Sequence, residues 1–277
     1  MSRLFVLGMG YAASHLAARL AADGWRVAGT TRDGRGGTVR FDDGDAVRGE
    51  IAAATHILSS VPPQGGGDPV LRDYGDALGA GAWLGYLSST GVYGDAGGAW
   101  VDETAPTGGG RRTDRSSADA AWMDRGARVF RLPGIYGPGR SPIDRVREGT
   151  AHRVASDHVF SRIHVADLAS GVIAGFDGPA GSYNLADDLP CSPNDVVTFA
   201  ARLAGVEPPP IVAVAALSPM AQGFYAEHRR VANAKAKRVL GWRLRYPDYR
   251  AGLRALSAMN SPTPVSAAPP AASRDQR

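Results

Sequence analysis

Three hydroxyl side chains cluster at the end of a short apolar segment near residue 90. In the stretch LSSTGVYGD, residues 87–95, Ser88, Ser89 and Thr90 follow an apolar run over residues 83–87, and Tyr93 comes three residues later. Hydroxyls at the carboxyl end of a buried strand can orient a substrate oxygen, or they can cap the turn that follows. The residue types alone are compatible with both roles. Which role these hydroxyls have depends on their position in the fold.

The elements that position these residues follow an alternating pattern. Short apolar runs predict strands over residues 3–7, 26–30, 38–41, 56–60, 83–87 and 128–132, and segments with helical apolar spacing lie between most of them. Strands that are buried on both faces of a parallel sheet appear as such runs, and helices connect them. The sequence therefore predicts an α/β fold with a Rossmann-type doubly wound parallel sheet.

A glycine turn joins the first strand to the first helix. The sequence GMGYAA, residues 8–13, has strand before it and helix after it. Gly8 permits the tight turn, Gly10 lets a pyrophosphate approach the backbone, and Ala13 keeps the helix close to the sheet. The amides of the helix start, including those of Tyr11 and Ala12, then face the phosphates. We predict a dinucleotide site here; an ordinary glycine turn is the alternative.

The end of the second strand indicates which dinucleotide binds. A carboxylate at this position would bind the ribose hydroxyls of NAD, but the sequence has Thr30, Thr31 and Arg32. An arginine can pair with a 2′-phosphate, and the Thr31 hydroxyl can assist. NADP is therefore the expected cofactor, with NAD as the alternative.

The composition of the chain argues against several classes of function and partner. The 277 residues carry a formal net charge of +4 without a dense basic block, so nucleic acid is not an expected partner. The single cysteine, Cys191 in a Pro-rich turn, excludes a disulfide within the chain and fits a cytoplasmic location. No apolar run is long enough to cross a membrane, and we expect neither a membrane partner nor a bound metal. A homodimer is compatible with the sequence, although no pattern indicates one.

Four motifs occur in an order that resembles the extended short-chain dehydrogenase/reductase superfamily, in its NAD-dependent epimerase/dehydratase branch. They are GMGYAA, SSTGVYGD, RLPGIYGPG and SRIHVADLA, and the additional HILSSVPP is similar to an atypical subgroup, the YeeZ-like proteins. The resemblance implies further cofactor contacts at Ser60 and Val61. It also implies a dinucleotide-binding core over residues 1–140, to which later strands return, and a mainly substrate-binding lobe over 141–257. The Ser/Pro/Ala-rich residues 258–277 are expected to form a disordered tail.

The family resemblance also implies a catalytic set of Ser or Thr, Tyr and Lys. Ser89 aligns with the first of these, but Arg111 and Arg115 stand at the positions of the tyrosine and the lysine. No tyrosine occurs between Tyr93 and Tyr136, and the only lysines are Lys235 and Lys237. Arginine is too strong a base to exchange protons near neutral pH, although Arg115 can hold ribose hydroxyls.

Other residues are candidates for the missing roles. Tyr136 in GIYGPG is a candidate acid, with a packed aromatic as the alternative, and Ser89, Tyr93, Arg140 and Arg162 are candidates for substrate binding. We expect an NADP(H)-binding oxidoreductase or epimerase that acts on an unknown small molecule and lacks the Tyr-x-x-x-Lys pair. The alternative is a non-catalytic NADP(H) sensor or partner protein.

Overall fold

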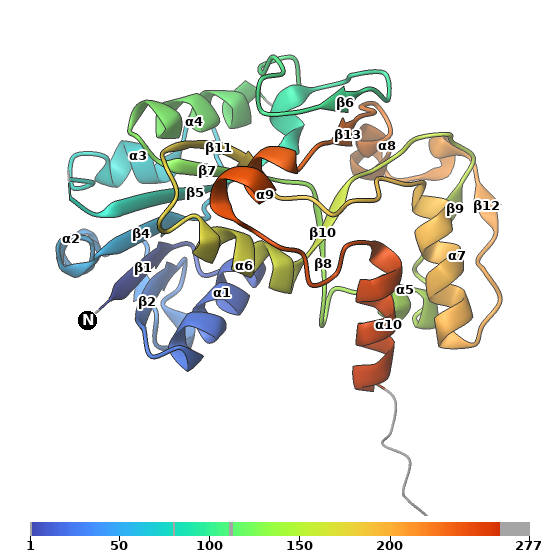
Figure 1. Cartoon of the computed structure of the whole chain (residues 1–277), viewed down its shortest axis with the longest axis horizontal. Helices are drawn as coiled ribbons and strands as arrows, with labels where there is room; N and C mark the ends of the chain where they lie inside the picture. Colours follow the sequence, from blue (N-terminus) through green and yellow to red (C-terminus); the bar gives the residue numbers. More distant parts are fainter. Residues whose placement is uncertain (1, 80, 111–112, 261–277) are drawn as a thin grey trace, which may run out of the picture.

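The computed structural model describes residues 2–79, 81–110 and 113–260. At its centre lies a seven-stranded parallel sheet with the order β11-β7-β5-β4-β1-β2-β3 (Figure 1). These strands are β1 (Arg3–Leu7), β2 (Arg26–Thr31), β3 (Val39–Arg40), β4 (His56–Ser59), β5 (Trp83–Ser89), β7 (Arg128–Leu132) and β11 (Gly181–Asn184). The expected α/β class with a Rossmann-type doubly wound sheet is confirmed.

Helices cover both faces of the sheet. One face carries α1 (Tyr11–Ala22), α6 (Val165–Ala174) and α9 (Ala234–Leu240), and the other carries α2 (Gly44–Ala53), α3 (Pro69–Tyr74) and α4 (Thr113–Asp124). Side chains of β1 alternate between the faces: Leu4 and Val6 pack with α1 and α6, whereas Phe5 and Leu7 pack with α2 and α3. All four are fully buried, which is why the strand is apolar from Leu4 to Leu7.

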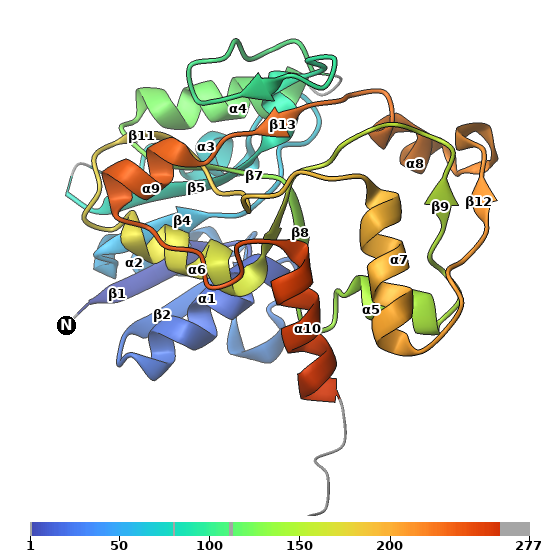
Figure 2. The ribbon, with the colours of Figure 1, turned by 45° about the vertical axis from the view of Figure 1, so that its right-hand side comes forward.

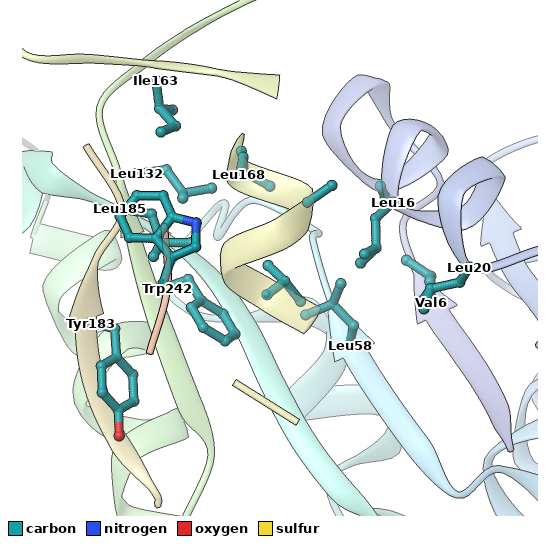
Figure 3. Packing of buried hydrophobic residues seen from close by; sticks show 14 of the residues in the cluster. Val6, Leu16, Leu20, Leu58, Leu132, Ile163, Leu168, Tyr183, Leu185 and Trp242 are labelled. Atoms are coloured by element: carbon teal, nitrogen blue, oxygen red, sulfur yellow. The ribbon is translucent and has the colours of Figure 1, made fainter. Parts of the chain in front are cut away.

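The first of these two cores fixes α1 and α6 over the sheet (Figure 3). Leu16 and Leu20 project from α1 toward Val6, and Leu168 projects from α6. Burying a side chain of this size contributes about 1.5–3 kcal/mol, so the start of α1 is held firmly against the carboxyl end of β1.

A smaller lobe adjoins the carboxyl end of the sheet (Figure 2). It contains α5 (Pro142–Arg147), β9 (Arg153–Val154), α7 (Pro193–Ala204), β12 (Ile211–Val212), α8 (Pro219–Phe224) and α10 (Tyr249–Asn260). Its own apolar core includes Ile143, Val196, Tyr249 and Leu253. We propose a dinucleotide-binding core over residues 1–140 and a mainly substrate-binding lobe over 141–257. The second range is not entirely substrate-binding, because α6, β11 and α9 lie within it but return to the sheet.

Short strand pairs connect the parts. β8 (Gly134–Tyr136) pairs in parallel with β10 (Arg162–His164), and β6 (Trp100–Val101) pairs with β13 (Arg230–Val231). The expected start of the tail at residue 258 is wrong, because α10 continues to Asn260 with Leu253 and Leu256 anchored in the lobe core. The rest of that predicted tail, residues 261–277, lies outside the described residues.

Candidate functional site

The sheet has a topological switch point beside β1. β1 pairs with β2 on one side and with β4 on the other, so the chain builds the sheet outward from β1 in both directions. In open α/β sheets a crevice forms at the carboxyl ends of the strands at such a point, and ligands bind there. The GMGYAA turn lies at this edge, because it directly follows β1.

Contacts from two neighbouring strand ends fix the turn. The Gly8 amide donates to Thr30 Oγ1 at 2.9 Å, and the Met9 amide donates to the Thr30 carbonyl oxygen at 2.7 Å. Gly8 has a φ of +93°, and a Cβ there would lie 2.9 Å from Val61 Cγ2. The Ser60 amide donates to the Leu7 carbonyl oxygen at 2.8 Å, which keeps the segment after β4 in place. Only glycine therefore fits at position 8.

An open space lies in front of Gly10. This residue is exposed, and a Cβ built on it would meet no atom within 4 Å. Gly10 is also the N-cap of α1 and makes no side-chain cap, so the first amides of the helix, those of Tyr11 and Ala12, are left for a ligand. Ala13 is fully buried behind them. The turn thus has the shape and the donors that fit a pyrophosphate group.

The end of β2 carries two threonines, and the cationic Arg32 follows them. Thr30 is buried because it holds the turn, and Thr31 Oγ1 lies 2.7 Å from Thr38 Oγ1. Arg32 is exposed and forms no ion pair within the described ranges. Its guanidinium is therefore available for an anionic ligand.

Arg140 lies beside the start of α1, and its expected role in substrate binding stays a prediction. Its guanidinium stacks over the Tyr11 ring at 5.5 Å from the centroid, and the Tyr11 hydroxyl donates to the Pro138 carbonyl oxygen at 3.0 Å. The loop after β8 thereby closes against the start of α1. Arg140 does not line the substrate-side cavity that is described next.

A cavity of about 670 Å³ lies between the sheet and the lobe. Its lining includes Ser89 at the end of β5, Gly91 just after it, Arg115 on α4, and Pro133 and Gly134 after β7. Cavities of this size hold small-molecule ligands. The structure thus brings Ser89 and Arg115 to one wall, while Arg111 lies outside the described residues.

Ser89 has both of the roles that the sequence left open. Its Oγ accepts a hydrogen bond from the Gly91 amide at 3.1 Å, which caps the turn after β5. The Ser89 side chain also lines the cavity. Because the oxygen acts as an acceptor in the cap, the hydroxyl hydrogen can still be donated to a substrate oxygen.

Tyr93 does not line this cavity, and its expected contact with substrate stays a prediction. The residue is 6% exposed, and its hydroxyl donates to Asn184 Oδ1 at 2.7 Å and accepts from Arg131 Nη1 at 3.1 Å. Arg131 forms a buried ion pair with Asp119 at 2.7 Å, and Asp119 also accepts from Ser88 Oγ at 2.6 Å. Burial raises the pKa of Tyr93. Tyr93 belongs to a polar network that supports the floor of the site.

Tyr136 is a packed aromatic residue, the alternative to its expected role as a proton donor. Its ring contributes to the cavity wall, but its hydroxyl lies against α10, where a methyl group at Gly252 would overlap it. The ring meets His164 edge-on with centroids 5.2 Å apart. Burial raises the pKa of Tyr136 far above its ordinary value, which disfavours proton transfer near neutral pH.

Asp187 is a candidate functional residue that the sequence did not indicate. It follows β11, is 1% exposed, and its Oδ2 makes no hydrogen bond among the described residues. Burial raises the pKa of its carboxyl to about 7. The sequence feature that could have indicated this residue is the acidic pair Asp187-Asp188, shortly after a strand. Among all the residues that the structure describes, no group of three or more His, Cys, Asp or Glu side chains could hold a metal, and no helix could span a membrane.

Solved structures with the same fold are numerous. A functionally unknown conserved protein from Silicibacter pomeroyi DSS matches with a TM-score of 0.83 and 42% identity, over 94% of this chain and 99% of that chain. Human epimerase family protein SDR39U1, solved with NADPH, matches with a TM-score of 0.71 and 16% identity, over 92% of this chain and 99% of its own. The second likeness concerns the fold.

Sequence relatives agree with this fold group, although no protein-family model matches the chain. A 3-diazoavenalumate denitrifying reductase from a Streptomyces species is 32% identical over 169 residues, 54% of this chain and 54% of that protein. The match thus spans about half of the reductase. Protein YeeZ from Escherichia coli K12 is 28% identical over 246 residues, 76% of this chain and 86% of YeeZ. With the doubly wound sheet and the glycine turn after β1, these likenesses are consistent with a YeeZ-like extended short-chain dehydrogenase/reductase.

Proposed function

We propose that this chain binds NADP(H) in the crevice beside β1 and acts as an oxidoreductase or epimerase on a small molecule held between the sheet and the lobe. The observation that carries the proposal is the open space at Gly10 in front of a helix start without a side-chain cap. Arg32, exposed and without an ion pair in the described part of the chain, favours NADP over NAD because it can bind a 2′-phosphate.

The cofactor contacts come mostly from the backbone. In this proposal the turn at Gly8 and Gly10 and the amides of Tyr11 and Ala12 hold the pyrophosphate, while Arg140 adds a positive charge beside them. Thr31 and Arg32 bind the 2′-phosphate, and Arg115 binds the ribose hydroxyls. Ser60 and Val61, in the segment after β4, provide the remaining cofactor contacts.

The reacting end of the cavity supplies orientation and charge. A bound nicotinamide gives or takes a hydride, which is the chemistry that side chains lack. Ser89 donates its hydroxyl hydrogen to a substrate oxygen and thereby fixes the reacting carbon. Arg115, at the position of the family's lysine, stabilises negative charge on the same wall. Since the Tyr-x-x-x-Lys pair is absent in this proposal, proton exchange falls to solvent or to the substrate.

A non-catalytic NADP(H) sensor is the second candidate. The packed Tyr136 hydroxyl favours it, because this candidate replacement for the missing tyrosine does not supply a proton donor. The Streptomyces relative is named a reductase, and this favours the enzyme. A cytoplasmic location and a homodimer stay predictions.

The proposal is tested first by cofactor binding. NADPH should raise the melting temperature of the purified chain more than NADH does, since ligand at 100 times its Kd adds about 2.7 kcal/mol to the free energy of unfolding. Equal shifts would contradict the preference for NADP, and no shift with either cofactor would contradict the proposed cofactor site.

A screen of aldehydes, ketones and sugar nucleotides, followed at the NADPH absorbance band, then separates the enzyme from the non-catalytic sensor. Tight NADPH binding without any oxidation of the cofactor would support the sensor.

A further inference from the structure

A buried cation lines the substrate-side cavity. Arg162 is 9% exposed, yet no carboxylate oxygen lies within 4.0 Å of its guanidinium among the residues that the structure describes. Its one side-chain hydrogen bond goes from Nη1 to Cys191 Sγ at 2.8 Å, and the guanidinium also stacks on the Tyr249 ring at 5.6 Å from the centroid. Buried charges in proteins are normally paired, because an isolated one loses its hydration.

The groups around Arg162 do not neutralise it. Burial raises the pKa of the Cys191 thiol, so the sulfur is uncharged near neutral pH. The carboxyl of Asp187 feels the charge of Arg162, but burial raises its pKa to about 7, and its Oδ2 has no hydrogen-bond partner in the described chain. A guanidinium carries five N–H donors, so Arg162 keeps donors for a ligand. These features indicate that an anion binds there.

Apolar and aromatic side chains form much of the remaining cavity wall, beside the polar Arg145, His152, Glu227 and Arg229. Phe160 and Tyr225 meet edge-to-face with centroids 5.5 Å apart, and Val196, Val197 and Leu253 line the lobe side. A polyhydroxylated sugar placed against the apolar part of this wall would leave the hydroxyls that face it without partners, at a cost of about 1–3 kcal/mol each. A flat ring buries its faces there without that cost. The lining thus favours an aromatic body over a sugar.

Sheet register relates Arg162 to the reacting end. Ser89 on β5 pairs with Leu132 on β7, and two residues further along the chain Gly134 pairs with Arg162. The route from Ser89 to Arg162 therefore takes two strand-to-strand steps of about 4.8 Å and two residues of chain. A molecule with one aromatic ring and a short carboxylate arm can reach both.

We propose that the cavity binds an aromatic carboxylate, with the carboxylate paired to Arg162, the ring against Phe160 and Tyr225, and the reacting end near Ser89. This assignment deepens the proposed NADP(H)-dependent function and rests on it. It differs from a nucleotide-sugar substrate, which would place a polyhydroxylated ring against the apolar wall.

Isothermal titration calorimetry on the full chain tests the assignment, with and without saturating NADPH. The probes are trans-cinnamate, its neutral isostere cinnamamide, and UDP-glucose. We expect cinnamate to bind at least tenfold more tightly than either of the others. Arg162→Met should reduce cinnamate binding to the level of the amide. The matched control is Arg202→Met, an exposed arginine on α7 outside the cavity, and it should bind cinnamate as the unchanged chain does.

Each outcome bears on one proposal. Equal binding of cinnamate and cinnamamide, tightest binding of UDP-glucose, or no binding of cinnamate to the NADPH-loaded chain would overturn the assignment. A chain that binds cinnamate through Arg162 but does not bind NADPH would leave the assignment standing and remove the proposed cofactor. The three-probe comparison on the unchanged chain decides the matter even when Arg162→Met fails to fold.

Discussion

The cofactor crevice and the substrate-side cavity recognise ligands in different ways. In the crevice the recognition surface is backbone: Gly8 and Gly10 leave room, and the first amides of α1 supply donors. In the cavity it is side chains, with Ser89, Arg115 and Arg162 contributed by segments far apart in the chain. A site made of backbone groups depends on one short sequence motif. A site made of side chains depends on the fold, which brings distant segments together. The first kind is therefore far easier to find in a sequence.

The largest expected effect concerns the polar network that supports the floor between the two regions. Asp119→Ala leaves the buried Arg131 without its ion-pair partner and should lower the free energy of unfolding by about 3–5 kcal/mol. Urea denaturation followed by circular dichroism measures it. Asp73→Ala, which breaks the exposed pair with Arg72, is the control and should cost at most about 1 kcal/mol. Similar losses in both variants would contradict a supporting role for the network.

A second prediction tests the buried carboxyl on the cavity side. Because the pKa of Asp187 is raised to about 7, the folded state keeps a proton that the unfolded state releases near pH 4. Stability is then lost as the pH rises toward 7, by on the order of 3 kcal/mol in total. Asp187→Asn should remove this loss, as measured by urea denaturation from pH 4.5 to pH 8. Asp188→Asn, at the exposed neighbour, should keep the slope of the unchanged chain. Parallel curves for Asp187→Asn and the unchanged chain would contradict the prediction.

The crevice is tested by filling the open space at Gly10. Gly10→Leu should fold normally, because no atom lies within 4 Å of its Cβ, but it should weaken NADPH binding at least 100-fold, about 2.7 kcal/mol. Fluorescence titration with NADPH measures the affinity, and a melting curve without cofactor checks the fold. Gly49→Leu, an exposed glycine on α2 with equal space, is the control. Unchanged affinity in Gly10→Leu would mean that no phosphate lies at this turn.

The smallest effect separates the two nicotinamide cofactors. Arg32→Glu should weaken NADPH binding by roughly tenfold, about 1.4 kcal/mol, and leave NADH unchanged, because the 2′-phosphate alone meets this exposed side chain. Titrations of both cofactors against the same protein give the ratio. Arg35→Glu, three residues along the same loop and exposed, is the comparison variant. If both cofactors bind Arg32→Glu as before, Arg32 is not the phosphate ligand.

Sequence by itself determined the parallel sheet and the glycine turn after β1. Buried strands have to be apolar on both faces, and a phosphate-binding turn has to carry glycine, so both constraints are local and visible. The first helix, α1, begins at Tyr11, directly after this turn. Gly10 serves as the N-cap without a polar side chain, so the usual start signal is missing.

Only the tertiary structure decided which polar side chains meet in the cavity. Tyr93 and Tyr136 both lie in motifs that resemble catalytic segments, yet partners distant in sequence, Asn184 and the backbone at Gly252, determine where each hydroxyl points. Arg140 and Arg162 are indistinguishable by type, but one stacks on Tyr11 and the other is buried in the cavity wall. The direction of a side chain depends on what packs against it, and that is set by segments that the local sequence does not contain.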